Sequence, residues 1–162
     1  MLVIADNLSV RNAKYMEAVK KKDKKAIEVM AKELASFGAE MINVQVSLDG
    51  VGDEDVLPMA MEAVQNGAQL PLCLDSRNVK ALRKAVPLCK EPPIINYLSA
   101  DEKNPEEMLS LVRETKSSLI IRALKGRMRS SAWKLILRAS SANTPKAVNR
   151  DCWESRVSTC SN

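Results

Sequence analysis

The sequence predicts an α/β fold in which parallel strands alternate with helices, as in part of a (β/α) barrel. Its first indication is a series of short apolar runs bounded by turn residues, typical of strands buried on both faces of a parallel sheet. Segments long enough for a helix separate these runs. Only 3% of the 162 residues are aromatic, and a core of aliphatic side chains suits a helix-covered sheet.

Five strands are expected, and no G-x-G-x-x-G or G-x-x-x-x-G-K motif follows the first of them. Spacing alone does not separate a barrel from a doubly wound sheet, but the missing phosphate-binding motifs favour the barrel. A partial barrel requires its strands to be neighbours in chain order, whereas a doubly wound sheet reverses direction at the first strand. The expected strands span residues 2–5, 41–46, 70–74, 93–95 and 118–121.

Helices are expected in every connection between these strands. Asp23 can cap the second helix, and Gly38 can end it in a left-handed conformation. Pro105 fits the first turn of the helix before the last strand. The remaining helices are expected over residues 12–21, 56–65 and 79–86, and the one at Pro105 continues to about residue 115.

The charge distribution divides the chain near Gly126. Residues 1–125 hold 18 basic and 18 acidic side chains, whereas residues 126–162 hold 7 basic and 2 acidic ones, so the net charge of +5 resides in the tail. We interpret residues 1–125 as one β/α unit and residues 126–162 as an unrelated basic tail, partly helical or disordered. Within it, the spacing of Trp133, Ile136 and Leu137 predicts a basic amphipathic helix over residues 128–140.

Composition excludes several classes of site. The chain has no histidine, which removes Ser-His and Cys-His triads and the commonest metal ligand, so we expect no bound metal. Its four cysteines show no C-x-x-C pairing. No stretch resembles a signal peptide or a membrane span, and the basic residues of the tail do not cluster. We therefore expect a cytoplasmic protein without a nucleic-acid or membrane partner.

Two polar residues follow successive apolar runs and are the main site candidates. Asp75 comes after Leu72-Cys73-Leu74, and Asn96 comes after Ile94-Ile95. The carboxyl ends of parallel strands are where α/β folds place their chemistry, so these two side chains are expected to share one site. Each also has a structural interpretation, Asp75 as a cap of the helix near residue 79 and Asn96 as a turn residue.

These same segments resemble a known family. The apolar opening Met1-Leu2-Val3-Ile4, Gly38-Ala39 before a strand, the L-C-L-D-S segment ending at Ser76, and the downstream Ile95-Asn96 resemble the methyltetrahydrofolate:corrinoid protein methyltransferases. These are relatives of dihydropteroate synthase with a pterin-binding TIM barrel. The resemblance covers about residues 1–125, the first half of such a barrel.

The resemblance implies a role for the strand-end residues. It implies that Asp75 and Asn96 bind the donor and acceptor edge of a pterin, with Asp6 and Asn43 as further candidates, whereas no catalytic residue is assigned. Methyltetrahydrofolate would be the substrate. Cobalamin would act only through a separate corrinoid protein, whose reduced cobalt accepts the methyl group.

The sequence departs from the family at two strand ends. The family opens with Gly-Glu-Arg-x-Asn where this chain has Ala5-Asp6-Asn7-Leu8-Ser9, and Asn43-Val44-Gln45 stands where Asp-x-Asn is usual. The aspartate and asparagine of the later barrel strands have no counterpart in these 162 residues. The first hypothesis is therefore a pterin-dependent methyltransferase half-barrel that does not turn over methyltetrahydrofolate alone.

Other readings stand beside it. One is a non-catalytic remnant or interaction module of the same fold, and another is a pterin enzyme similar to dihydropteroate synthase. The abrupt change in composition at Gly126 would fit an out-of-frame or truncated gene. An open sheet edge would leave strands unpaired, so we expect a homo-oligomer or a complementing chain.

Overall fold

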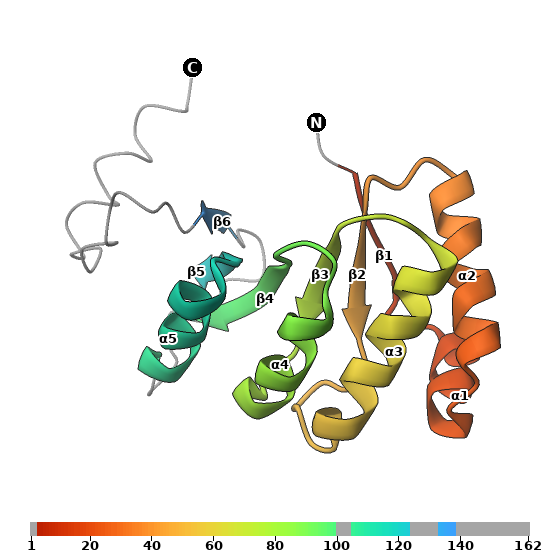
Figure 1. Ribbon diagram of the computed structural model, residues 1–162, viewed down its shortest axis with the longest axis horizontal. Helices are drawn as coiled ribbons and strands as arrows, with labels where there is room; N and C mark the ends of the chain where they lie inside the picture. Colours follow the sequence, from red (N-terminus) through yellow and green to blue (C-terminus); the bar gives the residue numbers. More distant parts are fainter. Residues whose placement is uncertain (1–2, 100–104, 124–132, 139–162) are drawn as a thin grey trace.

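The computed structural model describes residues 3–99, 105–123 and 133–138, and these form one six-stranded sheet with helices (Figure 1). The strands lie side by side in chain order, and β1 to β5 are parallel. The sixth strand pairs antiparallel with β5. The strands are β1 (Ile4–Leu8), β2 (Met41–Gln45), β3 (Leu72–Asp75), β4 (Ile94–Ser99), β5 (Ser118–Ala123) and β6 (Trp133–Arg138).

The helices occupy the connections between the parallel strands and lie against one face of the sheet (Figure 1). This arrangement confirms the α/β fold with strands in chain order, consistent with a partial TIM barrel, because a doubly wound sheet would carry helices on both faces and reverse its strand order. The helices are α1 (Ala13–Lys21), α2 (Lys24–Ser36), α3 (Asp53–Gly67), α4 (Val79–Ala85), the short 3₁₀ turn η1 (Val86–Leu88) and α5 (Glu106–Thr115).

Helix boundaries follow the capping residues of the sequence. Asp23 accepts a hydrogen bond from the backbone N–H of Ala26 at 3.0 Å and so caps α2, as predicted. Gly38, just beyond the end of α2, has φ of +88°, a conformation that glycine adopts at little cost. Pro105 immediately precedes α5. Local sequence therefore determines where these helices begin and end.

Both faces of the sheet are apolar over most of their area. On the helix side, Ile42 and Val44 of β2 and Leu74 of β3 are fully buried in the main core with the apolar faces of the helices. On the other face a separate cluster holds Met41, Cys73, Ile94 and Ile120, with Ile4 packed against it. Burial on both faces explains why the sequence of each strand is a nearly continuous apolar run. We call this second cluster the apolar layer.

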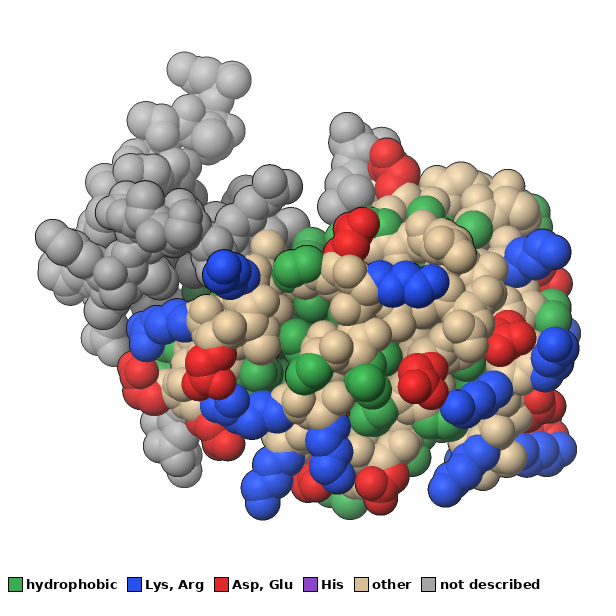
Figure 2. Space-filling view, viewed as in Figure 1, with side chains coloured by type: hydrophobic (Ala, Val, Ile, Leu, Met, Phe, Trp, Pro, Cys, Tyr) green, Lys and Arg blue, Asp and Glu red, His purple; other side chains and the backbone are tan. Residues whose placement is uncertain are grey.

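Charges of both signs cover the helix side. Figure 2 shows lysine and arginine side chains interspersed with aspartate and glutamate over this face. The lysines of the α1–α2 region take part in this mixture: Lys21 pairs with Glu17 at 2.7 Å and Lys24 with Glu62 at 3.0 Å. Such exposed pairs contribute little stability, so this lysine-rich stretch is a solvated surface. In the described residues, no helix is long and apolar enough to cross a membrane.

One predicted helix and one of the two interpretations of Asp75 are wrong. Within the helix predicted over residues 128–140, Trp133–Arg138 forms a strand instead, because it pairs antiparallel with the edge of β5, which would otherwise be open. Residues 128–132 and 139–140 lie outside the described residues. Asp75 does not cap α4, because the side chain of Asn78 accepts the hydrogen bond from the backbone N–H of Ala81. Leu2, Gly126 and the tail beyond residue 138 lie outside the described residues.

Candidate functional site

Four polar side chains from four neighbouring strands form one hydrogen-bonded group, which we call the polar row. Asp6 of β1 accepts a hydrogen bond from Asn43 Nδ2 of β2 at 2.7 Å. Asn96 Nδ2 of β4 donates to Asp75 Oδ2 of β3 at 3.0 Å and lies 3.5 Å from Asn43 Oδ1. The structure therefore brings together all four residues singled out in the sequence. Their role in binding a ligand stays a prediction.

Strand geometry explains how these four side chains meet. Each member of the polar row stands two residues after a member of the apolar layer, and the pairs are Ile4 and Asp6, Met41 and Asn43, Cys73 and Asp75, and Ile94 and Asn96. Because side chains alternate between the faces of a strand, residues two apart point to the same face. The polar row is therefore the next level above the apolar layer, toward the carboxyl ends of the strands.

Strand register places the row near the end of β3 but inside β4. Asp75 is the last residue of β3 and pairs in register with Asn96. Asn96 is not a turn residue after its strand, because β4 continues to Ser99 with an irregularity between Asn96 and Leu98. Asp6 likewise lies within β1, which extends to Leu8. Both strands run beyond their predicted ends.

Burial divides the polar row into amides and acids. Asn43 and Asn96 are 3% and 8% exposed, whereas Asp75 is half-buried and Asp6 is exposed. Burying a carboxylate costs more than burying a carboxamide, so the charged groups lie where water still reaches them. Among the described residues, the Oδ1 atom of Asn96 is buried and accepts no hydrogen bond. A buried acceptor without a hydrogen-bond partner is unusual in folded proteins.

Hydrogen bonds tie the loops around the polar row to one another. Gln45, the last residue of β2, accepts from the backbone N–H of Val10 at 3.5 Å, which links the loop after β1 to the end of β2. Ser76, directly after Asp75, donates to Asp53 at the start of α3 at 2.5 Å. Sequence reasoning missed Asp53 and Ser76, because an acid in the first turn of a helix is an ordinary feature of helices.

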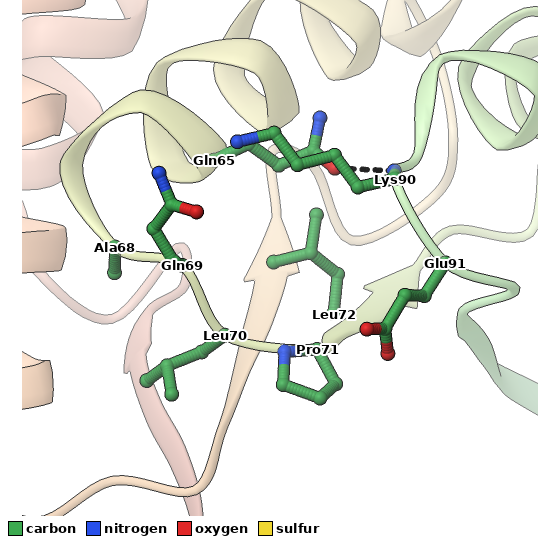
Figure 3. Close-up of a pocket in the computed structure, with 8 residues that line it drawn as sticks. All are labelled: Gln65, Ala68, Gln69, Leu70, Pro71, Leu72, Lys90 and Glu91. Atoms are coloured by element: carbon green, nitrogen blue, oxygen red, sulfur yellow. Dashed lines mark hydrogen bonds between the residues drawn. The ribbon is translucent and has the colours of Figure 1, made fainter.

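A separate hollow lies at the opposite end of the sheet (Figure 3). It is lined by residues 68–71 before β3 and by Leu72 at its start, together with Gln65 of α3, Lys90 and Glu91. The Gln65 side chain donates to the carbonyl of Leu88 at 3.1 Å and accepts from the backbone N–H of Lys90 at 2.8 Å, so its polar atoms have protein partners. This end carries the amino termini of the strands, where α/β barrels do not place their chemistry. The polar row remains the candidate site.

Fold and site together define a partial (β/α) barrel with a polar row at its carboxyl side. No family model matches the chain. It is 29% identical over 111 residues to the methylcorrinoid:tetrahydrofolate methyltransferase of Eubacterium limosum, a match that covers 68% of this chain and 41% of that protein. It is 23% identical over 101 residues to the acetyl-CoA decarbonylase/synthase complex subunit gamma of Methanocaldococcus jannaschii, covering 59% of this chain and 20% of that subunit.

The predicted resemblance is confirmed as distant homology to these two proteins. The chain spans about two fifths of the length of the first relative and a fifth of the second. In the described part of the chain, no group of three or more Cys, Asp or Glu side chains is placed to hold a metal ion.

Proposed function

We propose that this chain binds a reduced pterin of the tetrahydrofolate class at the polar row and acts in methyl transfer between methyltetrahydrofolate and a corrinoid protein. The observation that carries the proposal is the polar row itself, in which a buried carboxamide acceptor, Asn96 Oδ1, stands beside the Asp75 carboxylate. The name of the relative from Eubacterium limosum, which mentions tetrahydrofolate and methylcorrinoid, supports the choice of ligand.

A pterin suits the row because of its hydrogen-bonding edge. That edge carries an amino group and ring N–H groups in a fixed plane, and neighbouring acceptors on two strands can satisfy several of these donors at once. Asn96 Oδ1 offers one acceptor, and the carboxylate of Asp75 offers a stronger, charged one. Because Asn96 donates to Asp75 at 3.0 Å, the two side chains hold each other in place before a ligand arrives.

The contribution of these residues to methyl transfer is orientation. Methyl transfer becomes favourable when the methyl-bearing nitrogen gains positive character, and a pterin held by its edge presents that nitrogen at a fixed place. The corrinoid, carried by a partner protein, would supply the reduced cobalt that accepts the methyl group. No described residue is assigned as the acid that protonates the nitrogen, and the chain has no histidine for this task.

The test is calorimetric titration of the chain with methyltetrahydrofolate and, separately, with p-aminobenzoylglutamate, which lacks the pterin. We expect binding of the first ligand and none of the second at the same concentration. Replacing Asn96 by leucine, which is similar in size and has no acceptor, should weaken binding at least tenfold, about the worth of a buried hydrogen bond to a polar partner. Equal binding of both ligands, or no binding of methyltetrahydrofolate, would refute the proposal.

A further inference from the structure

Asp53 is a buried acid that the proposed pterin contacts do not use. It is 1% exposed, at the first position of α3, and its Oδ2 accepts a hydrogen bond from Ser76 Oγ, itself on a residue that is 2% exposed. Its other oxygen, Oδ1, is buried and has no hydrogen-bond partner among the described residues. Burial removes this carboxylate from water and only one of its oxygens has a hydrogen bond, although its place at the amino terminus of α3 offsets part of this cost. Such a group needs a reason beyond packing.

The hydrogen bond between Asp53 and Ser76 is one of several contacts that join the segment after β2 to the loop after β3. Ser76 Oγ also accepts from the backbone N–H of Asn78 at 3.1 Å, so this hydroxyl both donates and accepts. The side chain of Asn78 donates to the carbonyl of Gly50 at 3.0 Å while it caps α4. The loop after β2 and the loop after β3 are therefore joined at two points.

Gly50 makes this close approach possible. Its φ is +81°, and a Cβ atom there would lie 3.0 Å from the backbone nitrogen of Asn78 and 3.1 Å from its Cβ atom. The contact is tight enough that a side chain at this position would push the loops apart. Two hydrogen bonds and one close backbone contact thus join the two loops just beyond Asp75, one bond at Ser76 and the other bond and the contact at Asn78.

We propose that Asp53 is a positioning residue for Asp75: by holding Ser76, it fixes the end of β3 and aims the Asp75 carboxylate at Asn96. The expected effect on ligand binding rests on the proposed function. The expected effect on the geometry of Asp75 and Asn96 does not, because it can be measured on the ligand-free protein. Asp53 itself does not touch the ligand. Without it, Ser76 and the loop gain freedom, and the 3.0 Å bond between Asp75 and Asn96 loses its fixed geometry.

The structural part is tested by NMR on the ligand-free protein, through the side-chain amide resonances of Asn96. Asp53→Ala should shift these resonances, whereas Asp53→Asn, which keeps an oxygen acceptor for Ser76, should leave them near their original values. Gln65→Ala is the matched control, because it removes another buried polar side chain with two hydrogen bonds, at the opposite end of the sheet. Unshifted Asn96 resonances in Asp53→Ala, or equal shifts in the control, would overturn the inference.

The functional part is tested by methyltetrahydrofolate affinity in a double-mutant cycle. Asp53→Ala should weaken binding about fivefold to tenfold in the wild-type background, about the factor of one lost hydrogen bond. It should have a smaller effect in the Asp75→Asn background, because it acts through Asp75. An equal effect in both backgrounds would show a general structural role and refute the inference. If wild type binds no folate, the proposed function fails, and the NMR result alone decides whether Asp53 positions Asp75.

If Asp53→Ala does not fold, Ser76→Ala replaces it in both experiments. This variant removes the same hydrogen bond, together with the one from the backbone N–H of Asn78, without leaving a cavity the size of a carboxylate. It is expected to shift the Asn96 resonances in the same direction, and unshifted resonances in a folded Ser76→Ala protein would likewise overturn the inference.

Discussion

Replacing Asp75 by alanine is the most direct perturbation of the polar row. Asp75 accepts the Asn96 amide at 3.0 Å and lies half-buried at the end of β3. If its carboxylate also binds the pterin, its removal costs a hydrogen bond to a charged group, about 1.5–3 kcal/mol. The dissociation constant for methyltetrahydrofolate should therefore rise about 10-fold to 150-fold.

The same substitution should cost only moderate stability. Asn96 loses its 3.0 Å acceptor, but water can reach the half-buried position, so we expect a loss of about 1 kcal/mol in the free energy of unfolding. Asp23→Ala is the matched control, because it removes an aspartate whose helix cap contributes about the same stability. It lies outside the polar row and should leave the affinity unchanged.

Isothermal titration calorimetry and urea unfolding measure the two quantities on the same samples. A loss of less than about 1 kcal/mol in binding by Asp75→Ala would mean that Asp75 supports Asn96 and does not contact the ligand. An equal loss of affinity in Asp23→Ala would mean that binding follows stability alone. Either result would refute the prediction that the Asp75 carboxylate binds the pterin.

Three further predictions concern the framework that holds the site. Gly67→Ala would place a Cβ atom 2.1 Å from the backbone oxygen of Glu28, so we expect urea unfolding to show a loss of about 1–3 kcal/mol. Asn78→Ala removes the cap of α4 and a bond to the neighbouring loop, and should lose about 2 kcal/mol in the same assay. Hydrogen bonds, the larger from Arg83 and the smaller from Ser110, lower the pKa of Glu114 in the folded protein. The charged Glu114 therefore stabilises the fold at pH values above its pKa in the unfolded chain, and this stabilisation is lost as the pH falls through its pKa in the folded protein. Arg83→Met should therefore lose less stability than wild type between about pH 7 and about pH 3, measured by urea unfolding at both pH values.

The fold was largely predictable because its strands are buried on both faces. The apolar runs before Asp75 and Asn96 are short and bounded by turn residues, so their strands and order follow from the sequence. The tail strand was not predictable in this way. The apolar residues of this segment fit two periods equally well: that of a strand at Trp133, Leu135 and Leu137, and that of a helix at Trp133, Ile136 and Leu137. The segment forms a strand because it pairs with the edge of β5.

The four residues of the polar row could be singled out from the sequence, but their hydrogen bonds could not, and their role in binding a ligand stays a prediction. Asp75 and Asn96 were visible as polar residues after apolar runs, and Asp6 and Asn43 came from the resemblance to a family. The 2.7 Å bond from Asn43 to Asp6 depends on the register of β1 against β2, in which Ile4 pairs with Met41, and these residues are far apart in the sequence. The hydrogen bond from Ser76 to Asp53 joins residues 23 positions apart, and no local sequence pattern predicts it.

The bond between Asn43 and Asp6 also gives a physical meaning to one departure from the family pattern. An aspartate at position 43 would bring two carboxylates to hydrogen-bond distance, and one of them would have to hold a proton or move away. The carboxamide of Asn43 instead donates to Asp6 and presents its oxygen toward Asn96. Asn43 is buried, so this exchange of acid for amide keeps a charge out of the middle of the row. The two acids of the row are Asp6 and Asp75, and the amides between them leave one buried acceptor among the described residues, Asn96 Oδ1, without a hydrogen-bond partner.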